Sequence, residues 1–273
     1  MKSVTYPITA KEIQLYCALT TVNSKCTKLQ MVDLISKIMN LDKFTFFEGS
    51  SEGFLKALDE NAHIKKCEKG KILFLHEDPA EYFYIIKSGW VKLFRETLDG
   101  AQSISDILPE GNIFGETAVF ENNIYPHSAE TIEPSEIISV PIKLLKDELE
   151  NNHAFALKIL SYMARNRRRQ DIEIEHRTVQ NASQRIGCFL LRLAKTDHDG
   201  TIIIHLPYDK TLIASRLGMQ PETFSRALSK LKEKTGIRIK GATIEFDTLE
   251  QLISYCCIRC SSEFPCRDIL AAE

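Results

Sequence analysis

The spacing of hydrophobic residues divides the chain into a β-rich part and a helical part. Short runs rich in β-branched and aromatic residues fill positions 71–141, and turn residues such as Gly89 and Asp99–Gly100 separate them. Strands of this length, interrupted at such regular intervals, are typical of a compact antiparallel barrel or roll. The first part of the pattern therefore predicts an antiparallel, jelly-roll-like β-roll.

After Pro141 the pattern becomes helical for about forty residues, with one segment longer than most globular helices. Within it, residues at alternating spacings of three and four form a seam: Leu157, Leu160, Ala164, Arg167, Asp171 and Ile174. Polar residues in such a seam can tune register and association, so the pattern favours a dimerisation helix. The alternative is a single amphipathic helix packed on the roll.

The C-terminal third alternates helices with short strands. A helix near residues 181–196 leads to a strand at 201–207, and two further helices are separated by a turn at Gly218–Pro221. A hairpin with Lys240–Gly241 at its turn follows, and then a short helix for which Asp247 and Glu250 suggest a capping box. This order predicts a winged helix-turn-helix.

The predicted fold class is therefore α+β, with a sensory β-roll, a long helix and a winged helix-turn-helix. The expected divisions are a helical leader (1–45), the roll (46–150), the dimerisation helix (151–180), the winged domain (181–255) and a cysteine-rich tail (256–273).

Composition and the absence of targeting patterns indicate the expected cellular compartment. The 273 residues are 44% hydrophobic and carry a formal net charge of −2, as in an ordinary globular protein. We find neither a signal-peptide pattern nor an apolar run long enough to span a membrane. We therefore expect a cytoplasmic protein, in which structural disulfides are uncommon and clustered cysteines suggest metal or redox chemistry.

Charge is uneven along the chain. Residues 209–240 hold eight basic and three acidic side chains, a net charge of +5 within a chain of −2. Basic residues near phosphates supply sequence-independent affinity for double-stranded DNA, and the N-terminal end of the second helix of the motif normally enters the major groove. The DNA contacts expected on this basis are Glu222, Thr223, Ser225, Arg226, Lys230 and Arg216. An ordinary solvated basic face is the alternative.

Three stretches resemble the CRP/FNR superfamily of bacterial transcription regulators: "KGKILFLHEDPAEYFYIIKSGWVKLF", "GNIFGETAVF" and "LIASRLGMQPETFSRALSKLKEKTGI". The resemblance covers about residues 45–255. It implies a homodimer that binds DNA and works with RNA polymerase, rather than an enzyme. The Glu222–Ser225–Arg226 pattern is similar to the FNR-type reader, which implies an inverted repeat of TTGAT-like half-sites.

Two signals known in that family are disfavoured by the residues. Members that bind cAMP have an arginine for the phosphate where this chain has His127, and a neutral histidine is a poor substitute for a bidentate guanidinium. Haem is the second signal, since "QPETFSR" also resembles nitric-oxide-responsive members. Its possible axial ligands, which share no distinctive spacing, are His76, His127, His153 and His176.

The tail supplies a third signal. Four of the eight cysteines lie in "CCIRCSSEFPC" at 256–266, and thiolates at such spacing suit an iron–sulfur cluster. The tail resembles that of the Bacillus-type FNR, which implies a [4Fe–4S] cluster on Cys257, Cys260 and Cys266, completed by Asp171. Cys256 is the alternative to Cys257. Cys67 and Cys188, in apolar surroundings, are expected to be buried.

Other chemistries for the tail stay open. Four thiols suit structural zinc, and two suffice for a disulfide switch. A thiol oxidoreductase using Cys257 and Cys260 is the alternative of another class, although no βαβ pattern accompanies the pair. The expected signal is oxygen, nitric oxide or cellular redox state.

Overall fold

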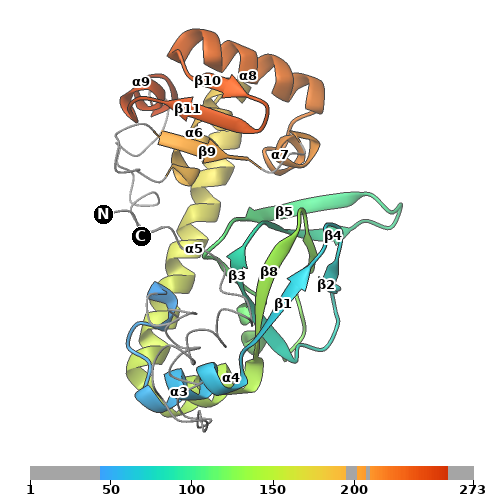
Figure 1. Cartoon of the computed structure of the whole chain (residues 1–273), viewed down its shortest axis with the longest axis vertical. Helices are drawn as coiled ribbons and strands as arrows, with labels where there is room; N and C mark the ends of the chain where they lie inside the picture. Colours follow the sequence, from blue (N-terminus) through green and yellow to red (C-terminus); the bar gives the residue numbers. More distant parts are fainter. Residues whose placement is uncertain (1–43, 195–201, 207–209, 258–273) are drawn as a thin grey trace, which may run out of the picture.

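The computed structural model describes residues 44–194, 202–206 and 210–257. An antiparallel β-roll, a long helix and a winged helix-turn-helix follow one another along the chain, so the predicted fold class is confirmed. The long helix runs beside the roll and continues to the winged unit (Figure 1). Cys260 and Cys266, and the expected leader before residue 44, lie outside the described residues.

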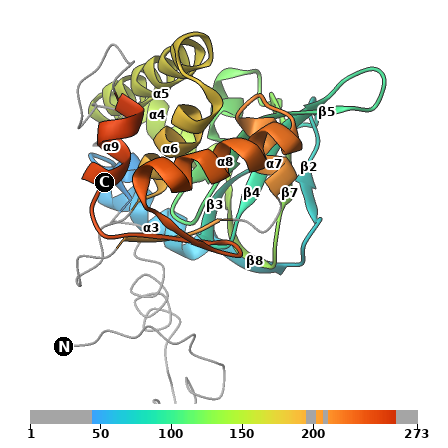
Figure 2. The same ribbon diagram turned by 90° about the horizontal axis from the view of Figure 1, so that it is seen from above.

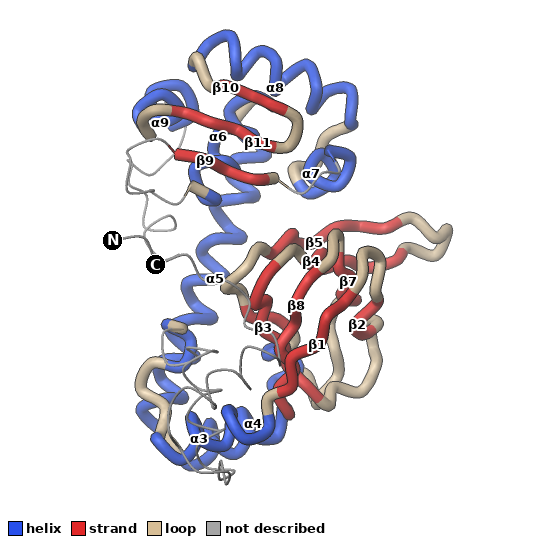
Figure 3. Tube along the Cα trace, in the orientation of Figure 1, coloured by secondary structure: helices blue, strands red, loops and turns tan. Residues whose placement is uncertain are grey.

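Two four-stranded antiparallel sheets build the roll (Figure 3). One has the order β1-β8-β3-β6 and the other β2-β7-β4-β5. The strands are β1 (His63–Cys67), β2 (Ile72–Phe74), β3 (Tyr82–Ser88), β4 (Val91–Glu96), β5 (Gln102–Leu108), β6 (Ile113–Phe114), β7 (Ser128–Thr131) and β8 (Ser135–Pro141). The turn between β3 and β4 needs Gly89, because its φ is +91° and a Cβ there would lie 2.2 Å from Ser135 Oγ.

Helices close one end of the roll. These are the short 3₁₀ segment η2 (Thr45–Phe47), α3 (Glu52–Asn61), the 3₁₀ segment η3 (Glu116–Phe120) and α4 (Ile142–Asn151). The buried carboxylate of Glu148 accepts hydrogen bonds from the backbone N–H and hydroxyl of Ser51, the residue that caps α3. Next, α5 (His153–Val179) begins at the Asn152 cap and packs Phe155 and Ile159 into the hydrophobic core that these helices share with the roll.

The winged unit has its own core. It contains α6 (Ala182–Leu193), β9 (Ile202–His205), α7 (Lys210–Arg216), α8 (Pro221–Thr235), β10 (Arg238–Lys240), β11 (Thr243–Phe246) and α9 (Glu250–Cys256). The three strands pair in the order β10-β11-β9, and helices pack on the inner side of Ile204, Ile244 and Phe246. Seen from above, α7 and α8 lie across the top of the molecule (Figure 2).

The expected capping box of the last helix is wrong. The cap position of α9 is Leu249, which makes no side-chain capping bond. Arg238 donates two hydrogen bonds, of 3.0 and 2.8 Å, to the carboxylate of Asp247, so that carboxylate does not cap the helix. No helix in the described part of the chain is both long and apolar enough to cross a membrane.

Candidate functional sites

Local sequence fixes the start and the end of α8. Pro221 occupies its first turn, where a missing N–H costs nothing, and Gly236 ends it in the left-handed conformation with φ +73°. Phe224, Ala227, Leu228 and Leu231 turn into the core of the winged unit. The opposite face of α8 points away from this core and is therefore open to a binding partner.

That outer face carries most of the expected DNA contacts. Glu222, Ser225, Arg226 and Lys230 are exposed, and Thr223 is half-buried beside them. Among the described residues, Arg226 makes only a long hydrogen bond of 3.4 Å, from its Nε to the carbonyl oxygen of Glu222, and none of their carboxylates pairs with its guanidinium group. An exposed arginine, serine and glutamate at the start of a helix can together read base edges in a major groove.

The wing contributes less free charge than the sequence suggests. Arg238 pairs with Asp247 at 2.8 Å and with Glu245 at 3.4 Å, and Lys240 lies 3.4 Å from the same Glu245. Hydrogen bonds and charge from Asp247 raise the pKa of Arg238. The positive charge open to a phosphate therefore lies on α8 more than on the hairpin.

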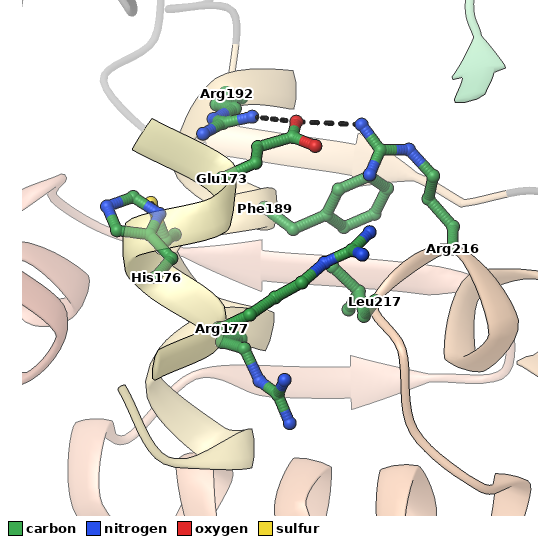
Figure 4. A pocket seen from close by; sticks show the side chains of 9 residues that line it. Glu173, His176, Arg177, Phe189, Arg192, Arg216 and Leu217 are labelled. Carbon is green, nitrogen blue, oxygen red and sulfur yellow. Dashed lines mark hydrogen bonds and ion pairs between the residues drawn. The ribbon is translucent and has the colours of Figure 1, made fainter. Parts of the chain in front are cut away.

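Arg216 lies away from this face. It is buried at the end of α7, where its Nε donates to Asp106 of β5 at 2.9 Å. Its Nη2 donates to Glu173 of α5 at 2.7 Å (Figure 4). In this conformation Arg216 is therefore withheld from DNA, because two carboxylates from other parts of the chain hold it.

Glu173 is the centre of this joint between the roll and the winged unit. Arg192 of α6 also donates to Glu173, at 2.6 Å. Burial alone would raise the pKa of Glu173, but hydrogen bonds and charges from Arg216 and Arg192 outweigh it and lower the pKa to about 2. An apolar cluster continues the contact, with Trp90 and Ile107 of the roll near Leu193 and Leu212 of the winged unit.

The interior of the roll is occupied by aromatic rings. Phe74 stacks on Tyr125 with ring centroids 3.7 Å apart, and Tyr84 stacks on Phe114 at 5.2 Å. The hydroxyl of Tyr125 donates to the carbonyl of Tyr82 at 2.5 Å, which holds its ring in place. Phe74, from the sheet that contains β2, also stacks on Tyr84 at 5.4 Å and on Phe114 at 6.0 Å, so aromatic rings join the two sheets inside the roll.

Two polar residues border this aromatic cluster. Glu116 is buried, and burial raises its pKa to about 7 although backbone N–H groups oppose the shift. His127 stands where the resemblance leads one to expect an arginine, and burial, followed by the charges of Arg95 and His76, lowers its pKa. A neutral histidine and a carboxylate that resists ionisation make a poor site for a cyclic phosphate.

The four described cysteines are in different surroundings. Cys67 and Cys188 are buried, as predicted. Cys188 Sγ lies 3.6 Å from Nδ1 of His176, which α5 also buries. His176 therefore packs into the winged unit, and Nε2 of the half-buried His76 contacts Arg95 Nη2 at 2.6 Å.

Cys256 and Cys257 differ although they are neighbours. Cys256 is 0% exposed, and a Cβ on Gly187 would lie 2.0 Å from its sulfur, so α6 needs a glycine at this point. Burial, and then Cys188 and Cys257, raise the pKa of the Cys256 thiol. Cys256 therefore lies within the core of the winged unit, and its sulfur could act as the alternative ligand only if this packing opened. Cys257 is half-buried at the end of α9.

Asp171 lies on the exposed surface of α5. Its carboxylate is 3.2 Å from Arg167 one turn earlier. Among the described residues no three His, Cys, Asp or Glu side chains gather to hold a metal.

A β-roll, a long helix and a winged helix-turn-helix with an open reading face define a DNA-binding transcription regulator. Family models agree: a cyclic nucleotide-binding domain matches residues 64–152, and a Crp-like helix-turn-helix domain matches residues 184–255. The chain belongs to the CRP/FNR family of transcription regulators, which are not enzymes.

The chain is similar to regulators with different names. The CRP-like cAMP-activated global transcriptional regulator of Mycobacterium tuberculosis is 25% identical over 209 residues, 76% of this chain and 93% of that protein. The anaerobic regulatory protein of Bacillus subtilis is 25% identical over 193 residues, 69% of this chain and 81% of that protein. The structure of a Ruegeria pomeroyi protein named for cyclic nucleotide binding matches with 31% identity and a TM-score of 0.63, covering 81% of this chain and 98% of that one.

Proposed function

We propose that this regulator senses oxygen, nitric oxide or redox state through a [4Fe–4S] cluster, held by Cys257, Cys260 and Cys266 with Asp171 as the fourth ligand. The observation that carries the proposal is the contrast within the cysteine pair. The winged core buries Cys256, whereas Cys257 reaches the surface where the thiol-rich segment begins. The aromatic filling of the roll supports a signal other than a cyclic nucleotide.

The proposed site joins two parts of the molecule. Cys257 ends α9 of the winged unit, and Asp171 lies on the long helix. A carboxylate is a hard ligand beside soft thiolates, so it exchanges more readily than they do. Loss of the cluster would remove one link between the winged unit and α5, and the sensor needs only to favour one arrangement over the other.

The long helix is the proposed dimer contact. Leu157, Leu160 and Ile174 of the predicted seam are 51%, 59% and 60% exposed in the single chain. Regulators of this family are typically dimeric, and burying such a stripe against a second copy removes apolar surface from water. The dimer would place two α8 helices on an inverted repeat of TTGAT-like half-sites, next to RNA polymerase.

Anaerobic purification tests the sensor. The expected protein is brown, contains about four iron and four sulfide per chain, as the cluster requires, and bleaches in air. Cys257→Ala, Cys260→Ala and Cys266→Ala should each lose iron, whereas Cys67→Ala, a buried thiol in the roll, should keep it. A colourless protein that contains zinc, or a sharp Soret band, would sink the cluster proposal.

DNA binding tests the reader. Arg226→Ala should weaken binding to the expected repeat by about 1–3 kcal/mol and relax the preference at one base. Lys230→Ala should weaken all sequences alike and lower the salt slope by about one. Fluorescence anisotropy at several salt concentrations separates the two. Equal losses on specific and random DNA for Arg226→Ala would contradict its role in reading.

A further inference from the structure

The joint around Glu173 contains a small cavity that the proposed sensor does not use. Its volume is about 40 Å³, enough for one small polyatomic group (Figure 4). Four arginines line it, and Glu173 is the only carboxylate among the lining residues: Arg177, Arg185, Arg192, Arg216 and Glu173. The walls of the cavity therefore carry an excess of positive charge.

Two of the arginines are already paired. Arg192 and Arg216 donate to Glu173 at 2.6 and 2.7 Å, and Arg216 also bonds Asp106. Within the described segments, Arg177 and Arg185 have no ion-pair partner. The excess charge therefore belongs to Arg177 and Arg185.

Arg185 supplies an unused donor at the cavity, whereas Arg177 is exposed to solvent. The Nε of Arg185 is buried and has no hydrogen-bond partner among the residues that the structure describes. Burial, and then the charge of Arg177, lowers the pKa of Arg185. Proteins seldom keep a buried donor unsatisfied beside a like charge, because each such group loses its hydration without replacement.

The cavity also lies at a mechanically useful place. Arg177 comes from α5, Arg185 from α6, and Arg216 with Leu217 from the end of α7. Gly218, in the turn before the reading helix, is so close that a Cβ there would lie 3.9 Å from Nε of Arg177. A group bound here would touch the long helix and the helix-turn-helix together.

We propose that this joint is a binding site for a phosphate group, either free phosphate or the phosphate of a small ester, held between Arg177 and Arg185. Guanidinium groups bind tetrahedral oxyanions through paired N–H donors, and the unsatisfied Nε of Arg185 supplies one of them. The pairing of Glu173 with Arg192 and Arg216 would stay in place. Binding would stiffen the joint and thereby alter the affinity of α8 for DNA, and DNA would alter phosphate affinity by the same factor.

Calorimetric titration of the full chain tests the site, with the chloride concentration adjusted to hold ionic strength constant. Inorganic phosphate and glycerol phosphate are titrated separately, which distinguishes the free anion from an ester. Arg177→Gln and Arg185→Gln should each weaken phosphate binding at least about tenfold, the usual effect of losing charge-assisted hydrogen bonds. Arg168→Gln, an exposed arginine on the same helix, is the control and should bind as the wild type does.

Several results would overturn the proposal. One is the absence of binding at millimolar phosphate, and another is equal binding by all four proteins, which would mean an adventitious ion only. If both variants keep phosphate affinity but lose DNA affinity with a shallower salt slope, the arginines contact the DNA backbone instead. Arg185→Lys guards against misfolding, since it keeps the charge without the fork and should give an intermediate affinity. The outcome does not depend on the cluster, because colourless protein is titrated as well.

Discussion

Glu116 and Glu173 are both carboxylates inside the molecule, yet their pKa values shift in opposite directions. Glu116 lies in the roll, where burial raises its pKa to about 7. Glu173 lies at the joint, where two arginines overcome burial and lower its pKa to about 2. The roll interior is thus a closed apolar core, whereas the joint is built around charge. The joint, unlike the roll interior, connects the roll, the long helix and the winged unit through these charged pairs.

The largest effect expected is from opening the core of the roll. Phe74→Ala removes a buried ring that stacks on Tyr125, and it should lower the free energy of unfolding by about 3–5 kcal/mol. Urea denaturation measures the loss. Phe120→Ala is the control, since that ring is half exposed and should cost less than about 1 kcal/mol.

The same experiment addresses the nucleotide. Millimolar cAMP should not shift the urea midpoint of the wild type. His127→Arg should not create a cAMP-dependent shift either, because the stacked rings still occupy the interior of the roll. A clear stabilisation by cAMP in either protein would show that the roll opens, and the comparison between roll and joint would then fail.

The second prediction concerns pH and Glu116. Its folded pKa lies above its ordinary value of 4.5, so the native state holds more protons than the unfolded state between about pH 4.5 and 7. Stability should therefore fall as pH rises through this window, by about 3 kcal/mol in total, and level off above it. Glu116→Gln should remove this slope and exceed the wild type in stability at pH 8. If the variant kept the same dependence of stability on pH, a group other than Glu116 would bind the extra proton of the native state.

The third prediction concerns pH and Glu173, whose pKa shift at the joint is opposite in sign to that of Glu116. The folded pKa of Glu173 lies below 4.5, so its contribution is present above that pH and is lost as pH falls toward 2. Glu173→Gln should destabilise the protein at pH 7 by about 1–3 kcal/mol, because Arg216 and Arg192 then share a neutral partner in a partly buried place. The difference from the wild type should shrink in acid. A stabilising effect at pH 7 would mean that burial dominates here as well.

Local signals made the fold readable from the sequence. Pro221 and Gly236 mark the ends of α8, and the spacing of Phe224, Ala227, Leu228 and Leu231 distinguishes its inner face from its outer one. The short strands between turn residues indicated a roll for the same reason. Such features depend on neighbours within a few residues, so the chain itself contains the information.

Sites that depend on distant partners were not readable. Arg216 counts as one more basic residue in a positive segment, and its sequence gives no sign that Asp106 and Glu173 hold it. Cys256 and Cys257 are chemically identical neighbours, and only the packing of α9 against Gly187 buries one and not the other. Asp247 had the right spacing for a helix cap, but Arg238 takes it from across the hairpin. Tertiary contacts decided all three cases.

The smallest expected effect on folding is at Asp171, a third carboxylate that belongs to neither environment. It is exposed, and its pairing with Arg167 one turn away is of a kind that contributes at most about 0.5 kcal/mol. Asp171→Asn should therefore have the same urea midpoint as the wild type when both are free of iron. The same is expected of Asp147→Asn, which changes an exposed carboxylate on α4. Under anaerobic reconstitution the two variants should separate, since only Asp171→Asn removes the proposed fourth ligand and speeds bleaching in air. Because Asp171 contributes so little to the fold, a large change in cluster lifetime at this position can only come from the cluster. Identical lifetimes in the two variants would remove Asp171 from the ligand set and leave the tail thiols to hold the metal without it.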